Sequence, residues 1–186
     1  MEINPKGFWE NEHVEGGHYN DHILIPHLID FLKTENAKSI VDFGCGNGYY
    51  VNEMVKAGLH ATGFDGNPFT PKLTNGLCGV MDLSIVKQLE PYDWVLSFEV
   101  GEHLPKEYED SFITNLHLNN KKGIILSWAV KGQGGPGHVN EQNNDYIKTK
   151  ICGLGYINDR KTELFLRNNC SLRWFKNTIM VFRKIS

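Results

Sequence analysis

The chain has 186 residues, of which 40% are hydrophobic and 22% charged, and its formal net charge is −3. This length suits a single domain, residues 1–186, with a sizeable core. No apolar run reaches the roughly 18 to 20 residues of a membrane helix, the N-terminus does not resemble a signal peptide, and the four cysteines are scattered as in reduced proteins. These features exclude a membrane protein and predict a cytoplasmic one, in the host cytoplasm if the source is viral.

Strands and helices are predicted to alternate along the chain. Residues 1–20 are irregular and aromatic-rich, and could form a lid. The predicted strands are residues 39–42, 61–65, 79–83, 91–98, 124–128, 156–159 and 178–183, read from short apolar runs. The predicted helices are residues 23–32, 47–58, 105–116 and 140–154, with a turn at 121–123 and a glycine-rich loop at 132–137. This alternation predicts an α/β fold with a parallel sheet covered by helices on both faces.

The stretch Ser39–Tyr50 contains three alternating glycines, Gly44, Gly46 and Gly48, after a strand and before a helix. Glycines let a backbone approach a ligand closely, and the free N–H groups at a helix start suit polar or anionic ligand atoms. A dinucleotide site would need a third glycine or alanine at position 49, where the chain has Tyr49. The spacing therefore disfavours NAD.

Acidic residues end the first three predicted strands: Asp42, Asp65 and Asp82. Parallel strands present their carboxyl ends at one edge of a sheet, which is where such folds bind ligands. Asp65 is suitably placed for both ribose hydroxyls of a nucleoside, and Asp82 for an adenine amino group. Three acids behind a glycine loop predict a nucleoside site.

The run Asp42-x-Gly44-x-Gly46-x-Gly48 resembles the first motif of the class I S-adenosylmethionine-dependent methyltransferases. The resemblance extends from about residue 20 to the end. It implies a Rossmann-like, mostly parallel seven-stranded sheet with an antiparallel C-terminal hairpin, and S-adenosylmethionine as cofactor. The expected cofactor-binding residues are Asp42, Gly44, Cys45, Gly46, Gly48, Asp65, Gly66, Asp82, Leu83 and Glu99.

The segment Glu99-Val100-Gly101-Glu102-His103 follows the fourth strand. It resembles the E-V-x-E-H segment of ubiquinone-biosynthesis O-methyltransferases and of small-RNA 2′-O-methyltransferases. In some of these the two carboxylates and the histidine bind a divalent metal, and one helical turn would place the three side chains on one face. Glu99, Glu102, His103 and a later His138 could therefore bind Mg²⁺ or Mn²⁺.

The alternative is a metal-free site. In many related enzymes the acid and histidine pack beside the methionine end of the cofactor, and His138 could act as a general base because imidazole titrates near neutral pH. The expected catalytic residues are His138, Glu102 and His103. His138 could also be an ordinary loop histidine bonded to the backbone.

His138 lies in Ser127–Asn140, a glycine-rich stretch that resembles uncharacterised methyltransferases of bacteria and large viruses. Such a loop can close over a substrate, and Gln133, His138 and Asn140 suit hydroxyl groups. We therefore predict an O-methyltransferase that acts on a small polyhydroxylated acceptor such as a sugar or glycan unit. An RNA ribose 2′-hydroxyl is the alternative acceptor, and a non-catalytic S-adenosylmethionine-binding regulator is the alternative function.

The charge is divided unevenly along the chain. Residues 1–149 hold 11 Lys or Arg against 20 Asp or Glu, whereas residues 150–186 hold 8 against 2. The C-terminal excess indicates a solvated basic edge, or attraction to an anionic substrate group. The negative net charge and the lack of a separate RNA-binding module make a nucleic-acid partner less favoured. Nothing in the sequence predicts the oligomeric state.

Overall fold

The computed structural model describes residues 3–10, 12 and 18–185, so parts of the irregular segment 1–20 lie outside the described residues. The strands are β1 (Ile40–Phe43), β2 (Ala61–Asp65), β3 (Cys78–Val80), β4 (Tyr92–Ser97), β5 (Asn120–Leu126), β6 (Tyr156–Asn158) and β7 (Met180–Lys184). The helices are α1 (Leu24–Thr34), α2 (Tyr49–Lys56), α3 (Thr70–Leu73), α4 (Glu109–Leu118), α5 (Asn144–Cys152), α6 (Arg160–Asn168) and α7 (Phe175–Thr178), with a 3₁₀ turn at Lys106–Tyr108. None of the described helices is long and apolar enough to cross a membrane.

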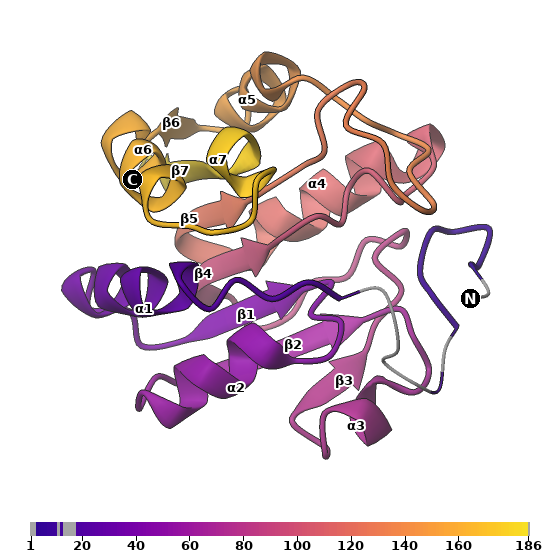
Figure 1. The fold of residues 1–186 in the computed structure, drawn as a ribbon, viewed down its shortest axis with the longest axis horizontal. Coiled ribbons are helices and arrows are strands. Elements are labelled where there is room, and N and C mark those ends of the chain that lie inside the picture. The colour runs from indigo at the N-terminus through magenta and orange to yellow at the C-terminus, as the bar shows by residue number, and fades with distance from the viewer. Residues whose placement is uncertain (1–2, 11, 13–17, 186) are drawn as a thin grey trace.

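The strands form one seven-stranded sheet in the order β3-β2-β1-β4-β5-β7-β6 (Figure 1). Strands β1 to β5 pair in parallel, whereas β7 is antiparallel to both β5 and β6. This confirms the predicted Rossmann-like α/β fold with an antiparallel C-terminal pair. The connection within that pair is longer than a hairpin turn, because it contains α6 and α7.

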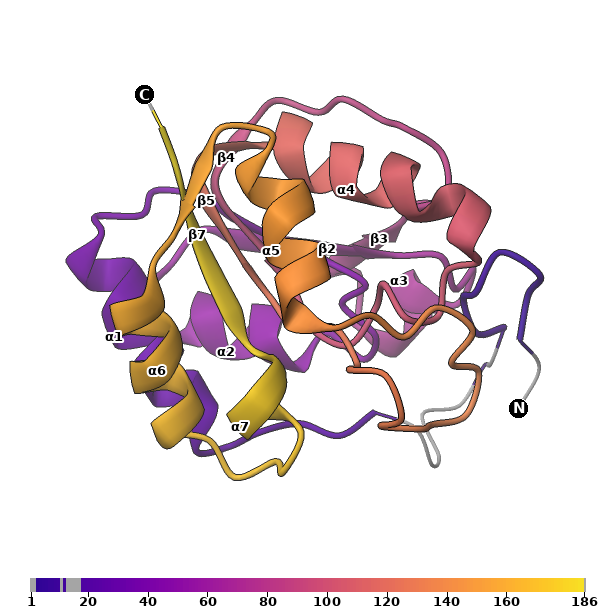
Figure 2. The same cartoon turned by 90° about the horizontal axis from the view of Figure 1, so that it is seen from above.

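Helices cover both faces of the sheet, with α4 and α5 on one side and α1, α2, α6 and α7 on the other (Figure 2). Strand β4 contributes side chains to the hydrophobic cores on both faces of the sheet. Trp94 packs with α1 and α2 residues such as Leu28 and Met54, while Val95 packs with Phe112 of α4. Alternate side chains of a strand point to opposite faces, so a strand buried on both faces must be apolar throughout.

Several predicted boundaries are wrong. Residues 121–123 are part of β5, because the strand begins at Asn120 and Gly123 already pairs with Trp94 of β4 and with Arg183 of β7. Helix α5 begins at Asn144 rather than at residue 140. The sequence patterns also missed α3, α6 and α7, and Thr178 ends α7 rather than starting the last strand. Helix α6 has a high proportion of charged residues, which hid its apolar stripe.

The strand order places a ligand crevice at β1. Strand β1 lies between β2 and β4. The sheet grows from β1 to β2 and β3 on one side, and the chain then returns to add β4 and β5 on the other side, so the strand order reverses at β1. Open α/β sheets bind ligands beyond the carboxyl ends of the strands at such a switch point. The segments that follow β1, β2, β4 and β5 therefore meet at one edge.

Candidate functional site

The glycine loop joins β1 to α2 and has the backbone shape that its sequence requires. Gly44, Gly46 and Gly48 have φ values of 80°, 53° and 71°. L-residues with a side chain rarely adopt these angles. A Cβ on Gly44 would also overlap Val100, and one on Gly46 would lie 2.6 Å from the His18 ring. The alternating glycines are thus explained by backbone conformation and by close packing.

Asp65, at the end of β2, supports this loop. Its Oδ2 accepts a hydrogen bond of 2.9 Å from the Gly46 N–H, and its Oδ1 accepts one of 2.9 Å from the Asn67 N–H. Asp65 also lines the cavity beside the loop. Each carboxylate oxygen has a further lone pair, so the side chain remains able to accept from ribose hydroxyls.

Asp82, which the sequence predicts to accept from an adenine amino group, already has hydrogen-bond partners within the protein. Its Oδ2 contacts Lys6 Nζ at 2.6 Å, and its Oδ1 accepts from the N–H and hydroxyl of Ser84. Burial alone would raise the pKa of Asp82, but the bonds from Lys6 and Ser84 lower it. Asp82 is not among the cavity-lining residues, whereas Leu83 and Ser84 are. An adenine amino group would therefore share this carboxylate with Lys6.

The other predicted cofactor residues divide into two groups. Asp42, Cys45 and Gly66, which the sequence predicts to bind the cofactor, line the cavity. Burial raises the pKa of Asp42 well above its usual value, and the nearby Cys78 and Asp65 raise it further. Gly48 does not line the cavity, because it caps α2 and a Cβ there would lie 2.8 Å from Thr74.

A single cavity of about 340 Å³ extends from the glycine loop to the segment after β5. Asp42, Gly44 and Asp65 line one end, and Glu99, His103 and His138 line the other. Its size is within the range of small-molecule sites, roughly 300–1,000 Å³. Aromatic residues complete its walls: Trp9, Tyr19, Tyr50, Phe98, Trp174 and Phe175.

Glu99 follows β4 in a strained conformation, with φ at 51°. Positive φ in a residue with a side chain is costly and often marks a functional site. Its Oε2 accepts from Gln133 Nε2 at 2.7 Å, and its Oε1 accepts from the Thr178 hydroxyl at 3.3 Å. Burial raises the pKa of Glu99, although these hydrogen bonds oppose the change.

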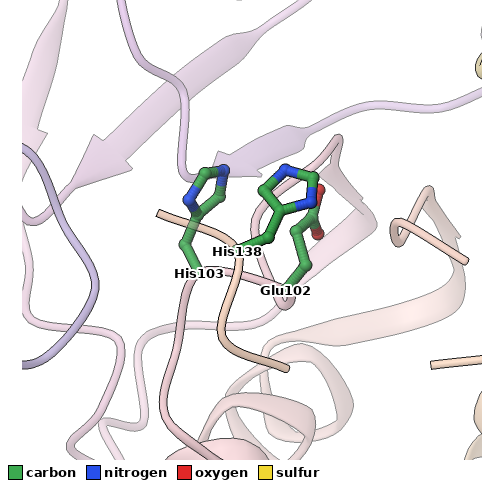
Figure 3. A group of neighbouring side chains, drawn as sticks. All are labelled: Glu102, His103 and His138. Carbon is green, nitrogen blue, oxygen red and sulfur yellow. The ribbon is translucent and has the colours of Figure 1, made fainter. Parts of the chain in front are cut away.

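Residues 101–104 form a turn and not a helix. The turn brings Glu102 and His103 beside His138, and ligand atoms of these three residues all lie within 4.8 Å of one another (Figure 3). The predicted metal role of Glu99 is not supported, because its side chain lies outside this group and is bonded to Gln133 and Thr178.

Glu102 is fully buried, and neither of its carboxyl oxygens has a hydrogen-bond partner in the described residues. Burial raises its pKa well above the usual value, and the neighbouring Glu99 raises it further. The His103 Nδ1 atom also lacks a partner there. Burial and the nearby His138 lower the pKa of His103 to about 4. Buried polar atoms without partners are rare and call for an explanation.

His138 is held by Glu141, a residue that the sequence reasoning missed. His138 Nδ1 lies 2.9 Å from Glu141 Oε1, and the same carboxylate accepts from the N–H groups of Gly132 and Gly134. A carboxylate can only accept, so Nδ1 carries the proton, and in the neutral imidazole Nε2 then has the free lone pair. The pKa of Glu141 is lowered, chiefly by its hydrogen bond to His138. Glu141 follows His138 by three residues in the run His-Val-Asn-Glu, and this spacing is the sequence signal that could have indicated the pair.

Sequence reasoning also missed Lys6, Trp9 and Trp174 as site residues. All three line the cavity, yet they come from the two ends of the chain. No motif links them to the glycine loop.

The methyltransferase domain family matches residues 17–126 of the chain, and none of the curated proteins matches it in sequence. Solved structures with the same fold include magnesium protoporphyrin IX methyltransferase from Synechocystis PCC 6803 with bound S-adenosylhomocysteine. That enzyme is 18% identical, with a TM-score of 0.68 over 92% of this chain and 91% of its own.

Two further enzymes share the fold. The methyltransferase domain of a bacterial Hen1 protein is 19% identical, with a TM-score of 0.61 over 88% of this chain and 98% of its own. The amino pentose methyltransferase CalS10 from Micromonospora echinaspora is 11% identical, with a TM-score of 0.63 over 87% of this chain and 90% of its own. The chain therefore belongs to the methyltransferase domain family, and it is a class I methyltransferase with S-adenosylmethionine as its methyl donor.

Proposed function

We propose that this enzyme transfers the methyl group of S-adenosylmethionine to a hydroxyl oxygen of a small polyhydroxylated acceptor, such as a sugar or glycan unit. One observation carries the proposal. His138, with its Nδ1 bonded to Glu141, lies in the same cavity as the glycine loop and Asp65. Donor and acceptor could thus meet in one cavity.

The reaction is an in-line displacement at the sulfonium methyl group. The acceptor oxygen forms a bond to the methyl carbon while the bond from carbon to sulfur breaks, and the acceptor proton leaves to a base. The sulfonium is already activated, so the protein chiefly aligns the reactants and excludes water. An alcohol is a weak nucleophile at neutral pH, so removal of its proton needs help.

We assign that help to His138. The Glu141 carboxylate fixes the imidazole with Nε2 as the proton acceptor and stabilises the imidazolium that forms. This resembles the support that an acid gives to a histidine base in other enzymes.

The same residues also fit a divalent cation. Glu102 and His103 have buried polar atoms without partners, and Glu141 bonded to His138 is the arrangement that commonly orients a metal-ligating histidine. Glu102, His103 and His138 would hold Mg²⁺ or Mn²⁺. The cation would supply positive charge that lowers the pKa of the acceptor hydroxyl.

Chelation separates these two arrangements. For His138 as base, turnover should survive EDTA, and His138→Ala should lose about 10²–10⁴-fold in kcat with unchanged cofactor affinity. Glu141→Gln should lower kcat as well, because an amide can donate to Nδ1 and favour the wrong tautomer. For a metal site, EDTA should abolish turnover, Mg²⁺ or Mn²⁺ should restore it, and Glu102→Gln should raise the metal concentration required. EDTA-resistant turnover in His138→Ala would contradict both.

The acceptor class needs its own test. Carbohydrates and short RNA oligonucleotides can be incubated with tritiated S-adenosylmethionine, and the labelled products hydrolysed to locate the methyl group. A labelled sugar hydroxyl would support the proposal. RNA is the second candidate, because the aromatic cavity walls, including Tyr19 and Trp174, could stack on a base; labelled ribose 2′-oxygen would show it. Labelled nitrogen would refute O-methylation.

We also propose a cytoplasmic location, since reduced thiols are expected from the cysteine pattern.

A further inference from the structure

The N-terminal strap, residues 3–10, forms a compact turn with its own hydrogen bonds. Ile3 and Trp9 form an isolated antiparallel bridge. Within it, the Asn4 N–H donates to the Phe8 carbonyl and the Gly7 N–H donates to the Asn4 carbonyl, both at 2.8 Å. A turn closed in this way can move as a unit.

The strap contacts the adenosine end of the cavity through two residues. Lys6 Nζ forms an ion pair of 2.6 Å with Asp82 after β3. The Phe8 side chain lies against Gly66 after β2, so closely that a Cβ on Gly66 would overlap it. Lys6 and Phe8 both line the cavity.

The same strap contacts the acceptor end. The Trp9 ring meets the His103 ring edge to face, with centroids 5.8 Å apart and an interplanar angle of 88°. The His103 ring also meets the His138 ring, with centroids 4.9 Å apart and an interplanar angle of 89°. Ile3 packs beside Gly137, where a Cβ would lie 2.9 Å from its Cδ1. His103 thus contacts both the strap, through Trp9, and the loop that carries His138.

We propose that the strap is a movable wall of the active site that couples its two ends, and that Trp9 is a positioning residue for His103. The ion pair between Lys6 and Asp82 keeps Trp9 in place. Lys6, Gly7, Phe8 and Trp9 all border the cavity, so movement of the strap would widen the path by which cofactor enters and product leaves. The side chains of Lys6 and Asp82 are 38% and 26% exposed, and an ion pair this accessible is weak enough to open. The inference concerns the proposed acceptor site, but its test does not use the acceptor.

S-adenosylhomocysteine serves as the probe. Its dissociation rate is measured by stopped-flow fluorescence, and the His103 ring is followed by the NMR signal of its Cε1–H, which nearby aromatic rings shift. We expect Lys6→Met to speed dissociation by about 2- to 5-fold and Trp9→Ala by about 3- to 10-fold. Lys6→Met should also move the His103 signal, although Lys6 is not among the ring contacts of His103.

Three variants sharpen the test. The double variant of Lys6→Met and Trp9→Ala should dissociate no faster than Trp9→Ala alone, because either change releases the same strap. Compared with Trp9→Ala, Trp9→Phe should return the His103 signal and the dissociation rate most of the way to their wild-type values. Lys56→Met removes an ion pair of similar length, 2.7 Å to Glu53 on α2, and should change neither measurement.

Additive effects in the double variant would overturn the inference, as would an unmoved His103 signal in Lys6→Met. Failure of the wild-type enzyme to bind S-adenosylhomocysteine would contradict the cofactor assignment itself. Failure to find a methylated hydroxyl would leave the strap measurements unaffected, so the two proposals can fail separately.

Discussion

The backbone carbonyl of Glu102 accepts a hydrogen bond of 2.9 Å from the backbone N–H of Asn140. This contact fastens the turn after β4 to the loop after β5, and so brings His103 and His138 together. The Asn140 carbonyl in turn accepts from Trp128 Nε1 at 2.7 Å, and its side chain donates to Glu109 at 3.0 Å. The proposed acceptor site therefore rests on a buried polar network.

Glu109 is the centre of that network, and its replacement should destabilise the protein. Its carboxylate, with only 1% of the side chain exposed, contacts Lys106, Lys150 and the Tyr146 hydroxyl in addition to Asn140. Glu109→Gln should lower the free energy of unfolding by roughly 1–3 kcal/mol, because the buried groups that donate to this carboxylate lose a charged hydrogen-bond partner. Urea denaturation measures this. Asp110→Asn is the control, since the Asp110 side chain is 85% exposed and its carboxylate pairs with Lys150 at the surface; an equal loss in the control would contradict the prediction.

The same carboxylate should make stability depend on pH in acid. Burial alone would raise the pKa of Glu109, but hydrogen bonds from Lys106, Lys150 and Tyr146 lower it to about 2. A group with a lowered native pKa binds its proton more readily when unfolded, so its stabilisation is complete above the unfolded pKa of roughly 4.3. That stabilisation is lost as the pH falls from there through 2. The difference in unfolding free energy between wild type and Glu109→Gln should therefore shrink over this range, and a constant difference would argue against it.

Asp65 should determine cofactor affinity. Asp65→Ala removes the acceptor for the Gly46 N–H and for ribose hydroxyls, so the affinity for S-adenosylhomocysteine should fall by roughly 1.5–3 kcal/mol, the range for hydrogen bonds to a charged group. Asp65→Asn keeps one oxygen and should lose less. Isothermal titration calorimetry measures both, and NAD should not bind at micromolar concentration. Micromolar NAD binding would contradict the assignment of the site.

Salt should have little effect on turnover. Of the eight cations in residues 150–186, four form ion pairs with acidic residues: Lys150, Arg160, Arg167 and Arg183. Lys184 donates to backbone carbonyls. These contacts favour a solvated basic edge over a surface that attracts an anionic acceptor. Turnover should stay nearly constant between about 0.1 and 1 M salt, over which the Debye length falls from roughly 10 to 3 Å. A steep fall would indicate an anionic acceptor.

Gly63 in β2 should tolerate no side chain. A Cβ there would lie 2.7 Å from the Cys45 Cβ and 2.9 Å from the Cys78 sulfur. Gly63→Ala should cost roughly 1–3 kcal/mol of stability through overpacking, and Cys78→Ala in the same chain should recover part of it. Gly58→Ala is the comparison, since a Cβ at Gly58 has open space and only its positive φ is unfavourable. Thermal unfolding of the three variants tests this, and a loss unchanged by Cys78→Ala would contradict the packing explanation.

Much of the cofactor end could be predicted from the sequence. The glycine loop was recognisable from Gly44, Gly46 and Gly48. Its backbone has positive φ at these alternate positions, which favours glycine, so the loop appears in the sequence as alternating glycines. Asp42 and Asp65 were recognisable because a strand buried on both faces is an apolar run whose end is easy to locate. The alternation of strands and helices predicted the α/β class, and the run Asp42-x-Gly44-x-Gly46-x-Gly48 carried the resemblance to the methyltransferase family.

Only the tertiary structure decided how the residues of the proposed acceptor end are arranged. Glu99 and Glu102 belong to one motif, yet packing turns Glu99 toward Gln133 and Thr178 and places Glu102 beside His138. Lys6 reaches Asp82 across 76 residues of chain. Such contacts depend on where the turns between elements direct their side chains. That direction is fixed by the packing of segments distant in the sequence, and no local pattern records it.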